Sequence, residues 1–405
     1  MAAVVCRAQN YEVRDQVKAD RYLAAGCEAP YRYHNEMTDA PKGYKPFYIS
    51  HYGRHGSRYA WNSGTYTTIQ RVLDAAERAG VLTPYGKEFC EQFREFSRMP
   101  LINTGDLTAL GAQQHYNIAE TMCRQFPEVF DNGGDVLARS TVVPRAITSM
   151  ASFVASLQKN APKVKVQTLS LHEDLVVTYP QDAPDELRQK IDKTPLKLDR
   201  SSLNYLAERN YNSILSRLFE STDFLMETGG LRNFISELYL FWSGYHNYCD
   251  DDRFEALLTP EEYTDLWEVE NFDIYCGHGG SRYQTVTLLK DIVENANAAI
   301  EGNGYCAHLR FGHDTVVNAF APLINLYGCG EQAKKAEDVK YWYQSFLCPM
   351  ASNIQFVLYR SKKSSEILFK VLWNNREATL PQLTPVSGPY YKWNDFVKWS
   401  HESEK

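Results

Sequence analysis

The chain has 405 residues, of which 44% are hydrophobic and 23% are charged, and its formal net charge is −7. This length exceeds what one simple hydrophobic core needs, so we expect two domains or one large elaborated domain. The acidic balance argues against a broad nucleic-acid surface, and no apolar run approaches the roughly 18 residues of a membrane-spanning helix. Any anion site must therefore be a local cluster of cations.

The first part of the chain predicts alternating strands and helices. The aromatic run "KPFYISHY" at residues 45–52 predicts a buried strand, and the apolar spacing in "TIQRVLDAAERAG" predicts a helix over 68–80. A second helix is predicted within residues 107–126. Residues 135–157 then predict a strand, a turn near Pro144 and another helix.

The strand–turn–helix pattern returns at residues 305–328, where we expect the strand to end near Phe311. Two more strands are predicted around the turn "KKSS" at residues 362–365. Between about 183 and 270 the pattern is helical instead, which indicates an inserted domain. We therefore predict an α/β fold: a large αβα domain with a mixed central sheet from residues 1–159 and 275–405, and a smaller all-α domain from residues 160–274.

The cysteines and the N-terminal residues bear on the cellular location. The nine cysteines form no C-x-x-C pair, and no H-E-x-x-H occurs, so the usual zinc-binding spacings are missing. We expect structural disulfides with one thiol left over, and buried free thiols are the alternative. The start "MAAVVCRAQN" is not an intact signal peptide. The expectation is a periplasmic, secreted or surface protein, and the sequence does not indicate an oligomeric state.

The stretch "HYGRHGSRYAW" at residues 51–61 places Arg54, His55 and Arg58 where the first strand turns toward a helix. In open α/β sheets ligands bind at this edge, and a helix N-terminus there favours an anion. Arginine suits a phosphoryl group because its planar fork donates two parallel hydrogen bonds. A solvated basic turn beside a core histidine is the alternative interpretation of this stretch.

Two later stretches have the same context at the end of a predicted strand. In "RFGHDT", His313 and Asp314 precede a helix that Thr315 is placed to cap, and a carboxyl group there can act as a general acid. In "ARSTVVPRAITS", a turn can bring Arg139 or Arg145 to the same edge. A capping aspartate and an arginine on a helix surface are the alternatives. A glycine-rich segment at residues 277–290 precedes a helix but fits no complete phosphate-binding motif.

Taken in order, these motifs resemble the histidine phosphatase superfamily, in its acid phosphatase and phytase branch. The R-H-G-x-R signature is Arg54 to Arg58, the R-S-T-x-x-x-R element runs from Arg139 to Arg145, and the late H-D is His313-Asp314. The segment "LTALGAQQHY" is similar to the family's L-T-x-x-G-x-x-Q, and the two C-terminal strands are similar to its closing hairpin. The resemblance covers most of the chain outside the helical insertion.

The resemblance implies a phosphomonoester hydrolase that acts through a phosphohistidine intermediate, with no metal and no other cofactor. Asp314 is then the general acid that protonates the leaving group, and His55 is the nucleophile. The phosphate-binding residues are Arg54, Arg58, Arg145 and His313. Arg139 is expected in a structural ion pair instead. The expected partner is a small phosphate ester, with the site in the cleft between the two domains.

The substrate expectation depends on one departure from a related branch. The multiple inositol polyphosphate phosphatases, which "HYGRHGSRY" also resembles, typically carry H-A-E at the late motif, whereas this chain has His313-Asp314-Thr315. We expect an inositol polyphosphate such as phytate to be the substrate. The alternatives are a sugar-phosphate phosphatase of the same mechanism, a phosphoglycerate-mutase-like phosphotransferase, and a phosphate-binding module without turnover.

Overall fold

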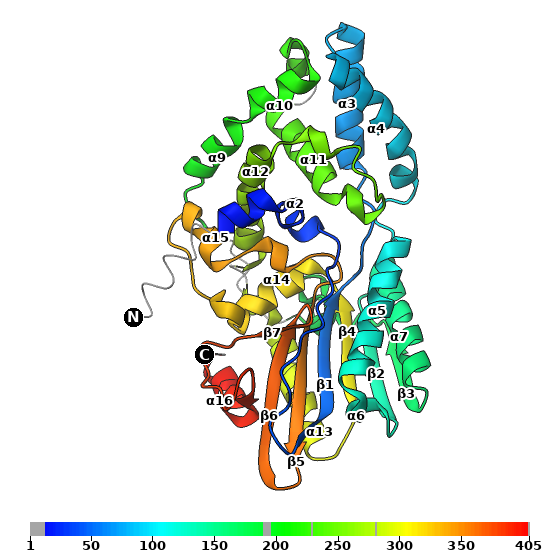
Figure 1. The fold of residues 1–405 in the computed structure, drawn as a ribbon, viewed down its shortest axis with the longest axis vertical. Helices are drawn as coiled ribbons and strands as arrows, with labels where there is room; N and C mark the ends of the chain where they lie inside the picture. Colours follow the sequence, from blue (N-terminus) through cyan, green and yellow to red (C-terminus); the bar gives the residue numbers. More distant parts are fainter. Residues whose placement is uncertain (1–12, 189–195, 228–229, 280–281, 404–405) are drawn as a thin grey trace.

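The computed structural model describes residues 13–188, 196–227, 230–279 and 282–403. Within these residues the central element is an eight-stranded sheet in the order β3-β2-β4-β1-β5-β6-β7, with β8 paired to β6 (Figure 1). The strands are β1 (Tyr44–Arg54), β2 (Gly134–Ser140), β3 (Val164–Leu169), β4 (Ala307–Gly312), β5 (Asn353–Ser361), β6 (Ser364–Trp373), β7 (Arg376–Ala378) and β8 (Tyr391–Lys392).

The sheet is mixed, as the sequence predicts. β1 is parallel to β4 and antiparallel to β5, while β2 is parallel to both β3 and β4. The three parallel strands β2, β4 and β1 are neighbours, so their carboxyl ends meet at one edge of the sheet. This edge is where the sequence motifs were expected to converge.

Helices cover both faces of the sheet and extend beyond one edge. The α-helices are α2 (Arg21–Ala24), α3 (Gly64–Ala79), α4 (Pro84–Ile102), α5 (Ala109–Gln125), α6 (Pro127–Phe130), α7 (Pro144–Asn160), α8 (Leu175–Thr178), α9 (Ser201–Glu208), α10 (Tyr211–Leu218), α11 (Leu231–Gly244), α12 (Pro260–Ile274), α13 (Val286–Ile300), α14 (Asp314–Leu323), α15 (Val339–Trp342) and α16 (Trp393–Ser403). Helices α5, α6 and α7 lie on one face of the sheet, and α13, α14 and α16 lie on the other (Figure 1). Their buried side chains join those of the strands in two separate hydrophobic clusters.

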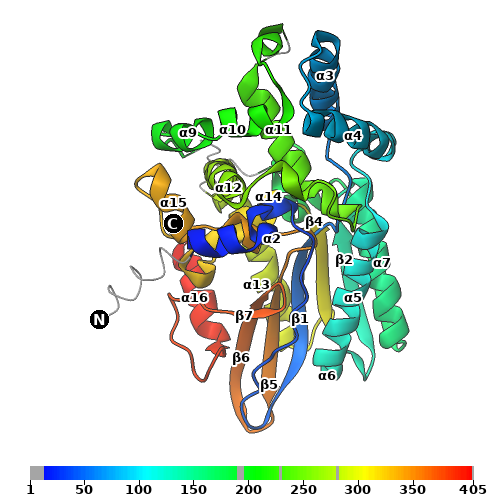
Figure 2. The ribbon, with the colours of Figure 1, turned by 45° about the horizontal axis from the view of Figure 1, so that its top comes forward.

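A helical cap, which consists of residues 64–102, 201–227 and 230–274, lies over the carboxyl edge of β1, β2 and β4 (Figure 2). One hydrophobic core joins α3, α4, α10, α11 and α12, with Phe89, Leu218 and Trp242 among its buried side chains. The aromatic side chains of Tyr239, Phe241, Trp242 and Tyr245 in the predicted insertion are therefore core residues, because they are buried between helices.

Packing crosses the predicted domain boundaries, which stay a prediction, in two places. Strand β3 pairs with β2 over residues 164–169, so the sheet continues past residue 160. Helices α3 and α4 lie outside the predicted insertion of residues 160–274, yet they share the core of the cap. The pairing of β3 and the packing of α3 and α4 both depend on long-range contacts, because a short strand or an amphipathic helix does not specify its partner in its own sequence.

Most predicted elements are present, and two details are different. The expected helix over residues 107–126 is α5, and the two late strands are β5 and β6. The helical pattern between residues 203 and 219 forms two helices, α9 and α10. The eight cysteines among the described residues are free thiols, so the expected disulfides are not found there, and Cys6 lies outside the described residues. In the described part of the chain no helix has the length and apolar character of a membrane span.

Candidate active site

The three strand-end motifs meet at one edge of the sheet. In the register of the sheet Arg54 of β1 is opposite Gly312 of β4, and Ser140 of β2 is opposite Phe311. His55 and His313, which follow β1 and β4, have ring centroids 5.5 Å apart. The three motifs can lie close together only if their strands are neighbours, and β2, β4 and β1 are adjacent in the sheet.

The imidazole of His55 is held in one tautomer. Its Nδ1 lies 2.9 Å from the carbonyl oxygen of Gly56, and because a carbonyl can only accept, Nδ1 must carry the proton. Burial, together with Arg54 and Arg145, holds the pKa of His55 well below its usual range. The ring is therefore neutral, and Nε2 keeps the lone pair that a nucleophile needs.

The turn that carries His55 is fixed by α5. A Cβ on Gly56 would lie 2.3 Å from the carbonyl oxygen of Gly111. The His55 turn and the start of α5 can therefore lie this close to each other only because both positions are glycines. Thr108 caps α5 and donates to the carbonyl oxygen of Ser57, and Gln114 accepts from the Ser57 amide at 2.8 Å. The L-T-x-x-G-x-x-Q segment thus has a physical role, which is to hold the R-H-G turn.

Three arginines converge beside His55 with different partners. Arg54 is fully buried, and its Nη1 donates to the carbonyl oxygens of Cys27 and Cys348. Arg58 forms an ion pair of 2.9 Å with Glu28. Arg145 has no ion pair within the described residues, and burial together with Arg58 lowers its pKa to about 10. The cluster therefore has more positive charge than its neighbours neutralise.

Several nitrogens of this cluster lack hydrogen-bond partners in the described structure. They are Nε of Arg54, Nε of Arg58 and Nε of Arg145, and all are buried. Nη2 of Arg54 has no hydrogen bond either, but it is ion-paired with Asp314 at 3.1 Å. Arg139 also has such an Nε, so one orphaned nitrogen is not diagnostic. Buried donors without acceptors are costly, and their convergence from three side chains fits an oxyanion.

His313 and Asp314 lie at the start of α14. The helix begins at Asp314 and His313 is its N-cap, so the expectation that Thr315 caps it is wrong; the Thr315 amide instead donates to Asp314 Oδ1 at 3.0 Å. His313 stays neutral because burial and then Arg145 lower its pKa to about 3. Burial alone would raise the pKa of Asp314, but Arg54, whose Nη2 is 3.1 Å from Oδ2, and Arg58 hold it far below its usual range.

Arg139 is outside this cluster. It forms ion pairs with Asp174 at 3.4 Å and with Asp291 at 2.7 Å, and Arg310 of β4 also binds Asp291. The expected structural ion pair is therefore present. Burial would raise the pKa of Asp291, and the two arginines instead lower it to about 2.

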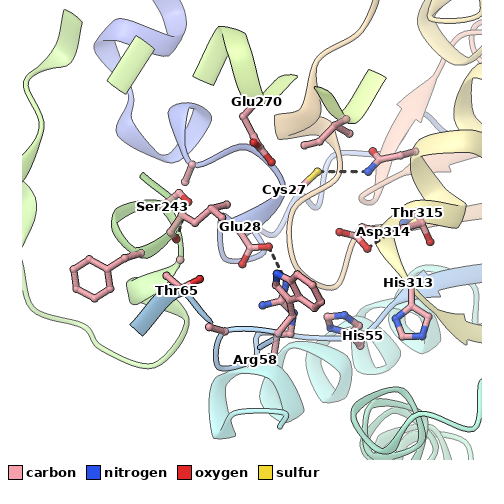
Figure 3. Close-up of a pocket in the computed structure, with 18 of the residues that line it drawn as sticks. Cys27, Glu28, His55, Arg58, Thr65, Ser243, Glu270, His313, Asp314 and Thr315 are labelled. Carbon is pink, nitrogen blue, oxygen red and sulfur yellow. Dashed lines mark hydrogen bonds and ion pairs between the residues drawn. The ribbon is translucent and has the colours of Figure 1, made fainter. Parts of the chain in front are cut away.

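A cavity of about 520 Å³ opens in front of His55, between the sheet edge and the cap. Its lining includes the predicted residues His55, Arg58, Arg145, His313 and Asp314. Figure 3 shows Arg58, His55 and His313 along one side of the cavity, with Glu28 bound to Arg58. Arg54 is not part of the lining but lies behind it, where its Nη2 contacts Asp314.

Sequence reasoning missed other residues that line the cavity. They are Glu28, Trp61, Tyr179, Tyr239, Glu270 and His278. His278 comes from the glycine-rich segment that fits no motif, in a π-helical turn at Tyr275–Gly279, and the sequence offers no signal that it faces the site. The ring of Tyr179 lies beside that of His313, with the centroids 4.5 Å apart and the planes tilted by 51°. These residues come from the cap and from loops, whose positions depend on tertiary packing.

One group among the described residues has the composition of a metal site. His246, Asp252 and Glu255 place their ligand atoms close together, away from the cavity lining. Arg21 lies 2.7 Å from Glu255 and already neutralises it, so the group does not fit a cation well.

The comparisons with known proteins agree with this geometry. Residues 53–226 match the model of the histidine phosphatase superfamily (branch 2), which confirms the resemblance predicted from the motifs. The match includes His55 and Arg145 but ends before Asp314, so the role of Asp314 does not rest on it. No curated protein sequence matches the chain.

Solved structures share the fold at low sequence identity. The multiple inositol polyphosphate phosphatase of Bifidobacterium longum, in complex with inositol hexasulfate, superposes with a TM-score of 0.77 at 20% identity, over 95% of this chain and 98% of that one. The phytase of D. castellii gives 0.72 at 16% identity over 95% and 85% of the two chains. The phytase of Citrobacter braakii gives 0.54 at 14% identity over 89% and 98%.

Proposed function

We propose that the protein is a phosphomonoester hydrolase that acts through a phosphohistidine at His55. The observation that carries this proposal is the fixed tautomer of His55, whose free Nε2 lies beside three arginines with unpartnered nitrogens. A nucleophile next to convergent N–H donors is the arrangement that phosphoryl transfer requires. The family match over residues 53–226 supports the same reaction class.

The first step transfers the phosphoryl group to the enzyme. Nε2 of His55 attacks phosphorus in line and the bond to the leaving oxygen breaks. Arg58 and Arg145 hold the equatorial oxygens from the cavity lining, and the buried Arg54 behind them adds positive charge. Asp314 gives its proton to the leaving oxygen, which departs as an alcohol. In the second step water attacks the phosphohistidine, Asp314 takes a proton from that water, and inorganic phosphate leaves.

The low pKa of Asp314 in the ligand-free site has a clear consequence for this mechanism. Arg54 and Arg58 favour the charged carboxylate. A bound phosphoryl group offsets that positive charge and adds negative charge, so it raises the pKa of Asp314 in the complex. We infer that Asp314 takes up its proton together with the substrate, and that phosphate release is fastest at acidic pH.

We propose inositol phosphates, including phytate, as the substrate class. The cavity has the size of a small-molecule site, and two structures of similar fold are named as an inositol polyphosphate phosphatase and a phytase. A sugar-phosphate phosphatase would share the same catalytic groups and differ only in the outer part of the cavity. The proposal includes no metal requirement, no nucleic-acid partner, and a periplasmic or secreted location.

The test is release of inorganic phosphate from phytate, glucose 1-phosphate and an aryl phosphate, with and without EDTA. The proposal predicts metal-independent release from phytate that vanadate blocks, because vanadate resembles a phosphoryl group held by the arginines. Activity that EDTA abolishes and magnesium or zinc restores would contradict the mechanism. Transfer to a sugar-phosphate acceptor with no release to water would indicate a mutase-like phosphotransferase.

A further inference from the structure

The charges of the cavity are divided between two sides. The cationic and imidazole groups of the lining are His55, Arg58, Arg145, His278 and His313. The opposite side, formed by the cap, carries Glu270 of α12 among aromatic and small residues such as Tyr239 and Ser243. Figure 3 shows Glu270 across the cavity from His55 and Arg58, with its carboxyl group directed toward the space between them.

Glu270 differs from the other carboxyl groups of the site in its contacts. Glu28 is ion-paired with Arg58, and Asp314 lies against Arg54. No hydrogen bond or ion pair joins the side chain of Glu270 to any described residue. Its carboxyl group lines the same cavity in which Arg58 and Arg145 lie, so a substrate whose phosphoryl group is held by these arginines lies within the space that Glu270 borders.

The charged groups that face Glu270 come from several elements. Burial raises its pKa to about 7, and Asp273 of α12, Glu28 and Glu237 of α11 act in the same direction, while Arg200, just before α9, opposes them. Tyr239 lies near enough that Glu270 contributes to raising the pKa of that phenol. Acidic neighbours outnumber the one arginine, so this side of the cavity disfavours a second anion.

We propose that Glu270 is a specificity-determining residue that contacts the part of the substrate remote from the transferred phosphoryl group. When Glu270 is ionised, it selects a hydroxyl group over a phosphate group at that part of the substrate. The proposal rests on the proposed function and names the preferred substrates within it, which are inositol phosphates that carry free hydroxyl groups. A carboxylate accepts hydrogen bonds from hydroxyls and repels a phosphate, whereas a carboxylic acid can donate to a phosphate oxygen.

The proposal makes the substrate preference depend on pH. Protonated Glu270 accommodates a hexakisphosphate at acidic pH, and ionised Glu270 excludes it as the pH approaches neutrality. The relevant quantity is the ratio of kcat/KM for phytate to kcat/KM for an inositol monophosphate. Because the two substrates share the same ring and leaving-group type, changes at His55 or Asp314 affect both and largely cancel in the ratio.

The experiment measures that ratio from acidic to neutral pH for the wild-type enzyme, Glu270→Gln and Glu91→Gln. Glu91 is exposed on α4, so it controls for the loss of one negative charge. We expect the wild-type ratio to fall toward neutral pH, and Glu270→Gln to raise it about 10-fold there, the effect of one charge-assisted contact. Glu91→Gln should retain the wild-type profile, and the acidic ratio should change little in either variant.

Two outcomes separate this inference from the proposed function. Wild-type enzyme that releases phosphate from none of these esters contradicts the proposed function itself. An active enzyme whose ratio and pH profile are the same in Glu270→Gln as in the wild type contradicts the role of Glu270 alone. Circular dichroism and the kcat for an aryl phosphate show whether the variant is folded, so a misfolded variant is not mistaken for either result.

Discussion

Replacing Arg145 by methionine should weaken phosphate binding and at the same time stabilise the ligand-free fold. Arg145 has no ion pair within the described residues, and burial and Arg58 lower its pKa from 12.5 to about 10. A shift of this size corresponds to about 3 kcal/mol of unfavourable interaction, which solvent screening at this partly exposed site reduces to about 1 kcal/mol. Methionine keeps an apolar side chain of similar length, so little packing is lost.

The assay is thermal unfolding with and without inorganic phosphate, combined with kinetics. Without phosphate, Arg145→Met should unfold about 1–2 °C above the wild-type protein, given the size of the domain. With phosphate, the wild-type melting temperature should rise while that of the variant should rise much less. The variant should also have a higher KM and a lower kcat, because the contact strengthens in the transition state. The reasoning would be refuted if the variant melted below the wild-type protein, or if phosphate raised the melting temperature of both proteins equally.

The other predictions concern the acid, the turn and the buried histidines. Asp314→Asn should slow phytate hydrolysis about 10²–10⁴-fold but slow the first step on an aryl phosphate much less, since a nitrophenolate needs no proton; equal losses in single-turnover measurements would show that Asp314 only caps α14. Gly111→Ala should reduce activity strongly, because its Cβ would lie 2.2 Å from the Ser57 carbonyl oxygen, and full activity would show that the turn is not fixed by α5. Burial lowers the pKa of His51 to about 3 and of His115 to about 4. As the pH falls below about 6.5, each of these two histidines should therefore lower the free energy of unfolding by about 1.4 kcal/mol per pH unit. Above about pH 6.5 these histidines are neutral in both the folded and the unfolded protein, so they no longer make the stability depend on pH. A free energy of unfolding, measured with urea, that stays constant as the pH falls to about 5 would contradict this prediction.

The predictable part of the molecule is local in sequence. Strand β1, the R-H-G turn and the following helix lie within one segment, and the same is true of β4 with His313 and Asp314. The apolar runs and turn residues of these segments specify strand, turn and helix. Because β1 and β4 are parallel and adjacent, their carboxyl ends lie at the same edge of the sheet. The local sequence therefore predicts that these motifs lie at one edge of the sheet, and the structure places His55, Arg58, Arg145, His313 and Asp314 in the lining of one cavity.

The unpredicted part depends on long-range packing. Glu28 precedes β1 by a loop and reaches Arg58 only because the chain folds back, and Glu270 faces the cavity because α12 packs in the cap. Helices α3 and α4 carry no sequence feature that assigns them to the cap. The cysteine count suggested disulfides, but the geometry that decides pairing is tertiary and leaves the described thiols free.

The central claim is that His55 becomes phosphorylated during turnover. The direct measurement is a rapid acid-free denaturing quench of enzyme with ³²P-labelled phytate, followed by identification of the labelled peptide. The account predicts label on the peptide that contains His55, stable to alkali and lost in acid, and none in His55→Ala. Label retained by His55→Ala, or turnover in that variant, would contradict the phosphohistidine mechanism.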